Sequence, residues 1–262
     1  MLKAKKITLA YQQKEIFSNL TLDIPSEKIT VLIGSNGCGK STLLKAFARQ
    51  LLPTHGEILL GQKNIYKSSP KDMAKVLALL SQNQAILEGL TVKQLVRYGR
   101  YPYHHLFSKW SHLDEECVQK ALHLTGSDVF VDQPLDSLSG GQRQRAWIAM
   151  TLAQDTPYIF LDEPTTYLDL PYQLDILELL RKLNKEEKKT IVMVLHDVNL
   201  AARFADYMIA IKNHAIAYTG TPQEIMTEEK IYDLFQLKNK VIQDPYHGIP
   251  MCIPLSFHEN AA

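Results

Sequence analysis

The sequence predicts a mixed α/β fold with an inserted helical segment. Two observations predict it. Strand-like apolar runs occur with helical patterns near both ends of the 262-residue chain. Between them, the stretch from about Thr91 to Leu124 repeats its apolar residues at helical spacing. The helical stretch therefore separates two parts of one α/β core.

The elements of the first part are expected in a strand–loop–helix order. Strands are predicted at Ile7–Ala10 and Leu20–Ile24, where apolar and polar residues alternate. The run Ile29–Ile33 is continuously apolar, which is typical of a strand covered on both faces. A helix is predicted at Ser41–Ala48, and a hairpin-like segment at Gly56–Gly61.

The second part begins after the helical segment. A further helix is predicted at Arg143–Leu152. Strands return at Tyr158–Leu161, Ile191–Leu195 and Tyr207–Ile211.

Composition excludes several classes of protein. The formal net charge is +1, from 29 basic and 28 acidic residues, so nucleic acid is not an expected partner. The three cysteines are too few and too widely spaced for a disulfide framework or a zinc ligand set, which favours a reducing compartment. No apolar run reaches the roughly 18 residues that a membrane span needs. A role at a membrane would therefore require a partner.

Residues 34–42 read GSNGCGKST and fit the pattern G-x-x-x-x-G-K-[ST], with a strand before and a helix after. The backbone N–H groups of such a loop turn inward around an anion, and the helix start adds its positive dipole end. Lys40 can neutralise phosphate charge, and the Ser41 hydroxyl can ligate Mg²⁺. The predicted phosphate-binding residues are Gly34, Ser35, Asn36, Gly37, Cys38, Gly39, Lys40, Ser41 and Thr42.

Two adjacent carboxylates, Asp162 and Glu163, follow the apolar run Tyr158–Leu161. Asp162 is expected to reach the Mg²⁺ shell, and Glu163 to polarise an attacking water. Neighbouring side chains on a strand point to opposite sides, so the two acids should not share one role. A solvated acidic turn is the alternative.

A second anion-binding pattern occurs at residues 138–145, LSGGQRQR, where Ser139 and two glycines open a helix. One chain thus carries two phosphate-type sites, and a simple kinase or GTPase has no use for the second.

Together, Gly34–Thr42, Leu138–Gln142 and Tyr158–Glu163 resemble the ATP-binding cassette (ABC) ATPases, and the resemblance extends over nearly the whole chain. It implies an α/β P-loop NTPase (RecA-like) core with an antiparallel β subdomain and an inserted α-helical subdomain. The expected limits are one ATPase domain over 1–240, with the core and β subdomain at about 1–84 and 155–240, the helical subdomain at about 85–154, and a short C-terminal tail at 241–262.

The resemblance also implies roles for single residues. Tyr11 is similar to the family's adenine-stacking aromatic, and Gln82 to the Q-loop glutamine that senses Mg²⁺ and the transmembrane partner. Asp169 lies in a segment similar to the D-loop, and His196 resembles the switch histidine near the γ-phosphate. The expected catalytic residues are Glu163, His196 and Lys40, the Mg²⁺ ligands are Ser41, Gln82 and Asp162, and the ATP contacts outside the phosphate loop are Tyr11, Gln82, Ser139, Gly140, Gly141, Gln142, Asp162 and Asp169.

In this family two subunits pair head to tail, so that residues 139–142 of one chain close over the ATP of the other. The expected partners are a second copy of the chain, polytopic membrane permease subunits and, indirectly, an extracytoplasmic substrate-binding protein. The expected location is the cytoplasmic face of the cell membrane, through the permease.

Four segments (residues 89–103, 161–170, 195–211 and 244–254) look like the ferric-siderophore, heme and vitamin B12 importers, most closely the ferric-siderophore branch. The expected function is ATP-driven uptake of an iron(III)-siderophore complex, in which ATP binding closes the dimer and hydrolysis reopens it. Heme or vitamin B12 import remains an alternative, as does a soluble non-transport ABC ATPase.

Two further expectations concern reactivity and docking. Cys38 lies close to a helix N-terminus and to Lys40, which should lower its pKa, unless the thiol is buried and inert. Tyr101, Tyr103 and Leu106 are expected either to dock a cytoplasmic helix of the permease or to lie in the helical core.

Overall fold

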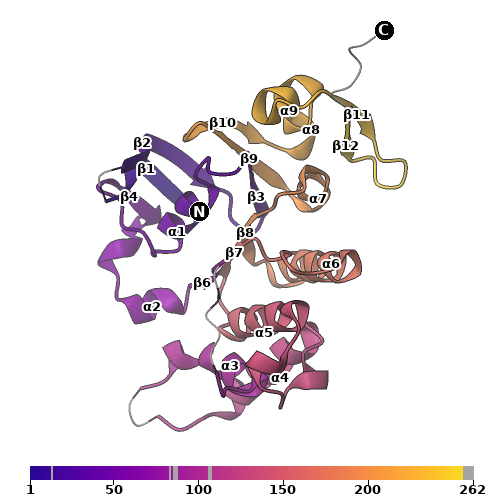
Figure 1. Ribbon diagram of the computed structural model, residues 1–262. Coiled ribbons are helices and arrows are strands. Elements are labelled where there is room, and N and C mark those ends of the chain that lie inside the picture. The colour runs from indigo at the N-terminus through magenta and orange to yellow at the C-terminus, as the bar shows by residue number, and fades with distance from the viewer. Residues whose placement is uncertain (13, 83, 85–87, 106–107, 256–262) are drawn as a thin grey trace. The chain divides into compact units, whose positions relative to one another are not determined.

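The computed structural model describes residues 1–12, 14–82, 84, 88–105 and 108–255 (Figure 1). The chain divides into two compact units. We call them unit 1, formed by Met1–Tyr66 with Val192–Ala262, and unit 2, formed by Lys67–Ile191.

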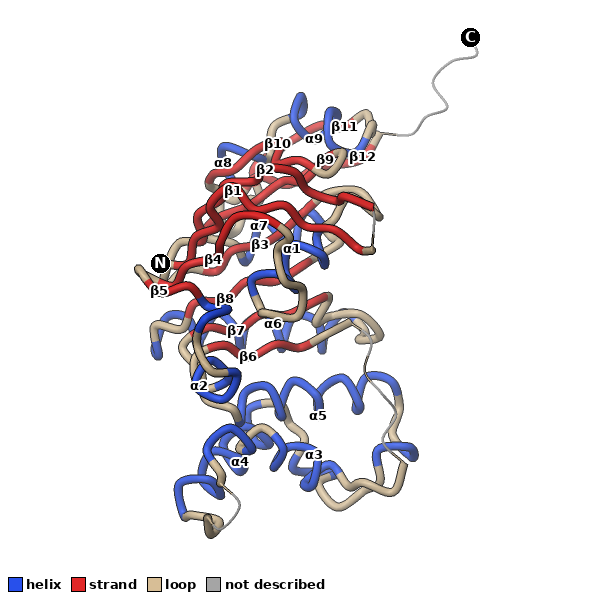
Figure 2. Tube along the Cα trace, turned by 90° about the vertical axis from the view of Figure 1, so that its left-hand side faces the viewer, coloured by secondary structure: helices blue, strands red, loops and turns tan. Residues whose placement is uncertain are grey.

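Unit 1 contains an antiparallel sheet in the order β2-β1-β4-β5 (Figure 2). The central strand β1 (Leu2–Tyr11) pairs with β2 (Lys14–Ile24) and with β4 (His55–Leu60), and β4 pairs with the short β5 (Lys63–Asn64). Alternate apolar side chains of β1 and β2 are buried, as the alternating pattern predicted. The antiparallel β sheet expected from the sequence is present.

A second group of strands in unit 1 leads into the glycine-rich loop. β3 (Ile29–Ile33) is buried at all five residues and runs parallel to β9 (Tyr207–Lys212), which pairs antiparallel with β10 (Ala215–Gly220). α1 (Lys40–Phe47) follows the loop. The other elements described in this unit are α7 (Val198–Phe204), α8 (Pro222–Ile225), α9 (Glu228–Phe235), and the hairpin of β11 (Asn239–Gln243) and β12 (Pro250–Pro254).

Unit 2 combines two parallel strands with helices. β6 (Leu77–Leu80) pairs in parallel with β7 (Tyr158–Asp162), and β8 (Thr190–Val194) carries the chain across the boundary between the units. The helices described in this unit are α2 (Pro70–Ala74), α3 (Val92–Tyr98), α4 (His112–Leu124), α5 (Gly140–Ala153) and α6 (Leu170–Glu187). Short 3₁₀ turns occur at Tyr101–Tyr103, Asp128–Phe130 and Leu135–Ser137, and a further one, Ile65–Lys67, spans the boundary between the units.

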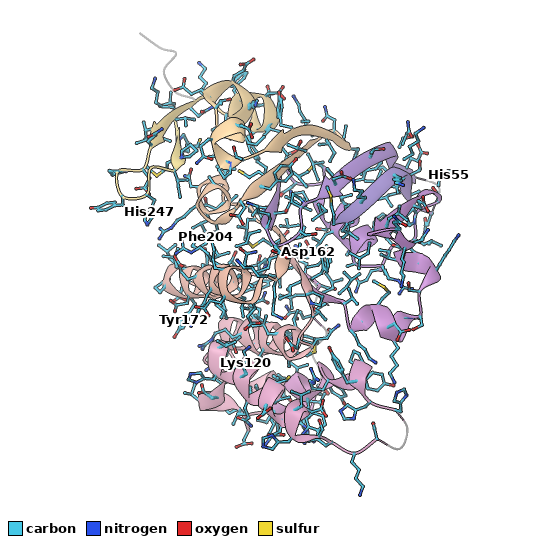
Figure 3. The ribbon with its side chains drawn as sticks, turned by 180° about the vertical axis from the view of Figure 1, so that it is seen from behind. His55, Lys120, Asp162, Tyr172, Phe204 and His247 are labelled. Atoms are coloured by element: carbon cyan, nitrogen blue, oxygen red, sulfur yellow. The ribbon has the colours of Figure 1, made fainter. Side chains whose placement is uncertain are left out.

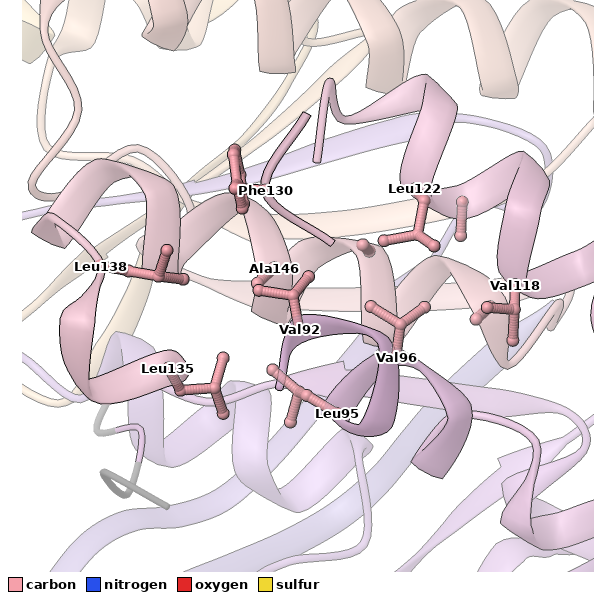
Figure 4. Close-up of a cluster of buried hydrophobic side chains, with 12 residues drawn as sticks. Val92, Leu95, Val96, Val118, Leu122, Phe130, Leu135, Leu138 and Ala146 are labelled. Atoms are coloured by element: carbon pink, nitrogen blue, oxygen red, sulfur yellow. The ribbon is translucent and has the colours of Figure 1, made fainter. Parts of the chain in front are cut away.

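Three helices of unit 2 begin at a capping box, in which two residues satisfy each other's backbone N–H groups. The pairs are Thr91 with Gln94, Ser111 with Asp114, and Ser139 with Gln142. Behind these starts, α3, α4 and α5 share an apolar core that includes Leu95, Leu122 and Ala146 (Figure 4). The inserted helical segment therefore has a core of its own.

A buried ion pair joins the same helices. Arg100 donates from Nε to Asp114 Oδ1 at 3.0 Å and from an Nη to the carbonyl oxygen of Ala153 at 3.0 Å. Only 2% of Arg100 and 4% of Asp114 is exposed. The end of α3, the start of α4 and the end of α5 are thus fixed by one guanidinium.

The structure differs from the expected elements in two places. The helical pattern of residues 91–124 is interrupted, because α3 ends at Tyr98 and Pro102 lies in a 3₁₀ turn before α4. The 18-residue helix α6 was not predicted, although its buried leucines repeat at helical spacing. Pro171 near its start is compatible with a helix, because the backbone N–H groups of the first turn have no partner within the helix and a proline there loses no hydrogen bond.

Candidate nucleotide-binding site

The side chain of Lys40 is folded into the glycine-rich loop of unit 1. Its Nζ donates to the carbonyl oxygens of Gly34 at 2.9 Å and Ser35 at 3.0 Å, and the residue is buried. α1 begins at Lys40 with Gly39 as its N-cap. The loop therefore places a positive charge beside the start of a helix, and both attract an anion.

Two glycines of the loop have no room for a side chain. A Cβ on Gly34 would lie 2.2 Å from the carbonyl oxygen of Ile211, and one on Gly39 would lie 2.6 Å from the Phe17 ring. Their φ angles are +145° and +108°, which side chains disfavour. The loop is thus a backbone cradle of the kind that fits polyphosphate.

We expect Gly34→Ala to destabilise the fold and to abolish ATP binding, because the new methyl group would push against backbone atoms. Gly37→Ala is the matched control. Gly37 also has a positive φ, but a Cβ there would meet no atom within 4 Å, so its cost is the backbone strain of about 1–2 kcal/mol. Thermal unfolding and calorimetric ATP titration of both variants test this. Equal losses in the two would contradict the steric argument.

The expectation of a lowered pKa at Cys38 was wrong, and the alternative of a buried thiol agrees with the structure. The residue is buried, with 5% of its surface exposed. Burial raises the pKa of the Cys38 thiol, and the nearby Lys40 offsets this only in part. Desolvation of the thiolate outweighs the neighbouring positive charge.

Cys38 should therefore react slowly with iodoacetamide in the folded protein and rapidly after unfolding. We expect Mg-ATP to slow the reaction further, and labelled protein to lose ATP binding, because the thiol lies within the loop. Peptide mapping with and without nucleotide measures this. Fast labelling that ATP leaves unchanged would contradict it.

Two other expected residues of unit 1 lie at strand ends. Tyr11 is the last residue of β1 and is 43% exposed, so its ring is accessible for stacking. His196 is exposed and comes directly after Leu195, whose backbone N–H donates to the carbonyl oxygen of Leu32 in β3 at 3.5 Å. The residue before His196 is thus hydrogen-bonded to the strand that leads into the glycine-rich loop.

Unit 2 carries the acidic pair in two different backbone states. Asp162 is the last residue of β7 and is 1% exposed (Figure 3). Glu163 leaves the strand with a φ of +55° and is partly exposed. Its Oε2 accepts a hydrogen bond from the Thr166 hydroxyl at 3.2 Å. The two acids occupy different environments, but not as alternating residues of one strand, as the sequence argument assumed, because β7 ends at Asp162.

The LSGGQ segment forms the exposed start of α5. The Ser139 hydroxyl caps the helix by accepting a hydrogen bond from the Gln142 backbone N–H at 3.2 Å. In return, the Gln142 side-chain oxygen accepts a hydrogen bond from the Ser139 backbone N–H at 3.0 Å. A Cβ added to Gly140 would lie 3.5 Å from Tyr167, and one added to Gly141 would lie 3.4 Å from Leu168, so both glycines are close to the turn after Glu163. The signature segment and the turn after Glu163 therefore form one local cluster.

The other two expected site residues of unit 2 are exposed. Gln82 follows β6, and Asp169 is the N-cap residue of α6. Sequence reasoning missed Gln144, a buried side chain of α5. It accepts a hydrogen bond from Gln84 and donates one to the carbonyl oxygen of Pro164. A polar residue among buried positions of a helix was the available signal.

Comparisons with known proteins agree with this arrangement. Residues 17–166 match the ABC transporter family. The achromobactin transport ATP-binding protein of Dickeya dadantii is 50% identical over 96% of this chain and 93% of its own length. The petrobactin import ATP-binding protein of Bacillus anthracis is 51% identical over 97% of this chain and 93% of its own.

Two solved structures are also similar. An inward-facing metal-chelate type ABC transporter has a TM-score of 0.83 and 28% identity, and the match covers 97% of both chains. A dimeric ABC cassette in a post-hydrolysis state, bound to ADP and phosphate, has a TM-score of 0.75 and 28% identity over 84% of this chain and 98% of its own.

The phosphate loop, the acidic strand end and the signature segment define an ABC-type ATPase, and the chain belongs to the ABC transporter family. It is an ATP-binding subunit that hydrolyses ATP. The P-loop NTPase fold expected from the sequence is confirmed. The similar cassette bound to ADP and phosphate is a dimer, and the petrobactin relative is named as an import protein.

Proposed function

We propose that this chain powers the uptake of an iron(III)-siderophore complex. One observation carries the proposal: relatives about half identical over nearly their whole length are named for siderophore transport, by achromobactin and petrobactin. ATP binding closes a head-to-tail pair of chains, and hydrolysis reopens it. An importer ATPase for heme or vitamin B12 is less favoured by these names, and a soluble non-transport ABC ATPase less again.

The residues fit the chemistry of ATP and Mg²⁺. The anchored Lys40 and the backbone of residues 34–42 would hold the phosphates, and Tyr11 the adenine. Hydroxyl, amide and carboxylate oxygens are the hard ligands that suit Mg²⁺, so Ser41, Gln82 and Asp162 are proposed to hold it. The bound ion would neutralise charge on the phosphates. Glu163 would orient and polarise the water, with His196 beside the γ-phosphate.

The partner's contribution is proposed to come from the signature segment. Ser139, Gly140, Gly141 and Gln142 of the second chain would complete the phosphate site, with Asp169 at the dimer contact. An extracytoplasmic substrate-binding protein is proposed to deliver the cargo to the permease.

Within the described residues, no helix has both the length and the apolar character to cross a bilayer. We propose that the permease holds the chain at the cytoplasmic face of the membrane. Copurification with a polytopic permease, followed by uptake of ⁵⁵Fe-labelled siderophore in cells lacking the subunit, tests the function. If deletion of the subunit left the uptake of the siderophore unchanged, the proposal that this chain powers siderophore import would be wrong.

The two tyrosines expected at the permease contact differ in the structure. Tyr101 is 75% exposed. The Tyr103 hydroxyl donates to the carbonyl oxygen of Gln154 at 3.0 Å, and its ring lies 3.9 Å from the Arg100 guanidinium. Tyr103 is therefore a packing residue of unit 2. Leu106 lies outside the described residues.

We expect Tyr101→Glu to weaken assembly with the permease while leaving folding and ATP binding intact, because the side chain is largely solvent-exposed. Tyr103→Glu should instead lower the unfolding temperature of the isolated subunit. Pull-down with the permease and thermal unfolding separate the two effects. Full assembly of the Tyr101→Glu protein would show that this surface does not dock the permease.

A further inference from the structure

Gln144 connects three segments of unit 2 through one buried amide. It lies on α5, two residues after the signature segment, and is 5% exposed. Its Oε1 accepts from Gln84 Nε2 at 2.9 Å, and its Nε2 donates to the carbonyl oxygen of Pro164 at 3.0 Å. Amide oxygen and nitrogen atoms are assigned from such contacts. Here the acceptor and donor ends are distinguished, because the Pro164 carbonyl can only accept.

The Pro164 carbonyl belongs to the turn that carries Glu163. Glu163 has a left-handed φ of +55°, a conformation that residues with a side chain adopt only when their surroundings impose it. Two bonds close the turn itself: the Thr166 backbone N–H donates to the Glu163 carbonyl oxygen at 3.3 Å, and the Thr166 hydroxyl donates to the Glu163 carboxylate at 3.2 Å. The bond from Gln144 anchors this turn to α5.

The neighbouring packing is also local to this turn. Pro164 is buried. Gly140 and Gly141, at the start of α5, lie close enough to Tyr167 and Leu168 that an added Cβ would touch them. The helix α5 is therefore close to the turn at its first residues and is bonded to it through the Gln144 amide one turn later. Truncating Gln144 would leave the buried carbonyl of Pro164 without this donor, which costs more than a lost surface bond.

We propose that Gln144 is a positioning residue for Glu163, and that it links the backbone of the catalytic turn to Gln84, in the segment that follows Gln82. This rests on the proposed role of Glu163 in water activation. If Gln84 moves, the hydrogen bond that Gln144 Oε1 accepts is altered. The Gln144 side chain then shifts, and so does the hydrogen bond that its Nε2 donates to the Pro164 carbonyl oxygen. The chain thus contains a direct hydrogen-bonded path from the segment after Gln82 to the residue after Glu163.

The test compares two substitutions in the full-length subunit. Gln144→Leu keeps most of the volume but removes both hydrogen bonds. Because small displacements of a catalytic group can cost up to about 10²-fold in rate, we expect kcat to fall by at least about tenfold. The affinity for ATP should stay unchanged, since no residue of the phosphate loop is altered. Wild-type kcat in this variant would overturn the proposal.

Gln144→Glu provides a pH signature that a loss of packing would not produce. Burial raises the pKa of a carboxyl group placed there, and only its protonated form can donate to Pro164. The ratio of variant kcat to wild-type kcat should therefore rise as the pH falls from about 8 to about 6. A ratio independent of pH, with kcat low throughout, would indicate a packing defect and contradict the proposal.

Asn184→Ala is the matched control for stability. Asn184 is also a buried amide on a helix of unit 2, and it donates to the carbonyl oxygen of Lys189 at 2.8 Å. We expect it to lower the unfolding temperature but not kcat. Glu163→Gln measured in parallel separates the two claims. If it hydrolyses ATP at the wild-type rate, the role of Glu163 fails; if it is slow and Gln144→Leu is not, only the positioning role fails.

Discussion

Glu163→Gln should nearly abolish ATP turnover while leaving ATP binding intact. Removing a general base typically costs about 10²–10⁴-fold in rate. The phosphate loop and Lys40 lie in unit 1 and are unchanged by this substitution. The amide can still accept from the Thr166 hydroxyl through its oxygen, so the local turn should be kept. Single-turnover hydrolysis and equilibrium ATP binding measure the two quantities separately.

Thr166→Val is the control for this prediction. It removes the hydroxyl that donates to the Glu163 carboxylate but keeps the carboxylate itself. We expect a much smaller loss of kcat than for Glu163→Gln. If the two variants lost activity equally, the carboxylate would have no role beyond that hydrogen bond.

Asp114→Ala should have the largest effect on stability. It leaves the 2%-exposed Arg100 guanidinium without its carboxylate partner, and breaking a buried ion pair typically costs about 3–5 kcal/mol. Asp23→Ala is the matched control: Asp23 also lies 2.9 Å from a cation, Lys3, but 45% of its side chain is exposed. Exposed pairs contribute about 0–1 kcal/mol. Denaturant unfolding of both variants gives the comparison.

The same carboxylate makes stability depend on pH. Burial opposes ionisation of Asp114, but hydrogen bonds from Ser111 and Arg100 outweigh it and lower the pKa to about 2, from an ordinary value of 3.8. A lowered pKa in the folded state adds stability that is full above 3.8 and is lost as the pH falls toward 2. The stability difference between wild type and Asp114→Ala should therefore shrink over that range. A constant difference would show that ionisation of the Asp114 carboxylate does not contribute to the stability of this site.

The sequence predicted those parts of the fold where local chemistry and tertiary structure agree. The strand Ile29–Ile33, the loop after it and the helix from Lys40 needed only apolar burial and glycine spacing. The buried strand before Asp162 followed from the same reasoning. The break between α3 and α4 was harder to predict from the sequence, because the apolar periodicity continues across it, whereas in the structure Pro102 lies in a 3₁₀ turn.

What the sequence could not provide was the environment of single side chains. Cys38 has the neighbours that lower a thiol pKa, yet its burial, which decides the direction, depends on tertiary packing. Tyr101 and Tyr103 are two residues apart and look equivalent in sequence, but only Tyr103 is held by Arg100 and Gln154. Gln144 lies within the quoted stretch 138–145 but was given no role there, because its partners Gln84 and Pro164 are distant in the chain.

The central claim is that ATP joins two chains through their signature segments. The most direct test is to measure the molar mass of the Glu163→Gln protein in the presence of ATP, with and without the additional substitution Ser139→Arg. ATP should hold two chains together, with one nucleotide per chain, because each signature segment completes the partner's site. The added arginine should return the protein to single chains by placing bulk where the partner's phosphate would lie. The dimer is measured by light scattering and bound-nucleotide counting on the isolated subunit or, if it pairs weakly, in the permease complex. A nucleotide-dependent dimer that survives Ser139→Arg unchanged would contradict the account.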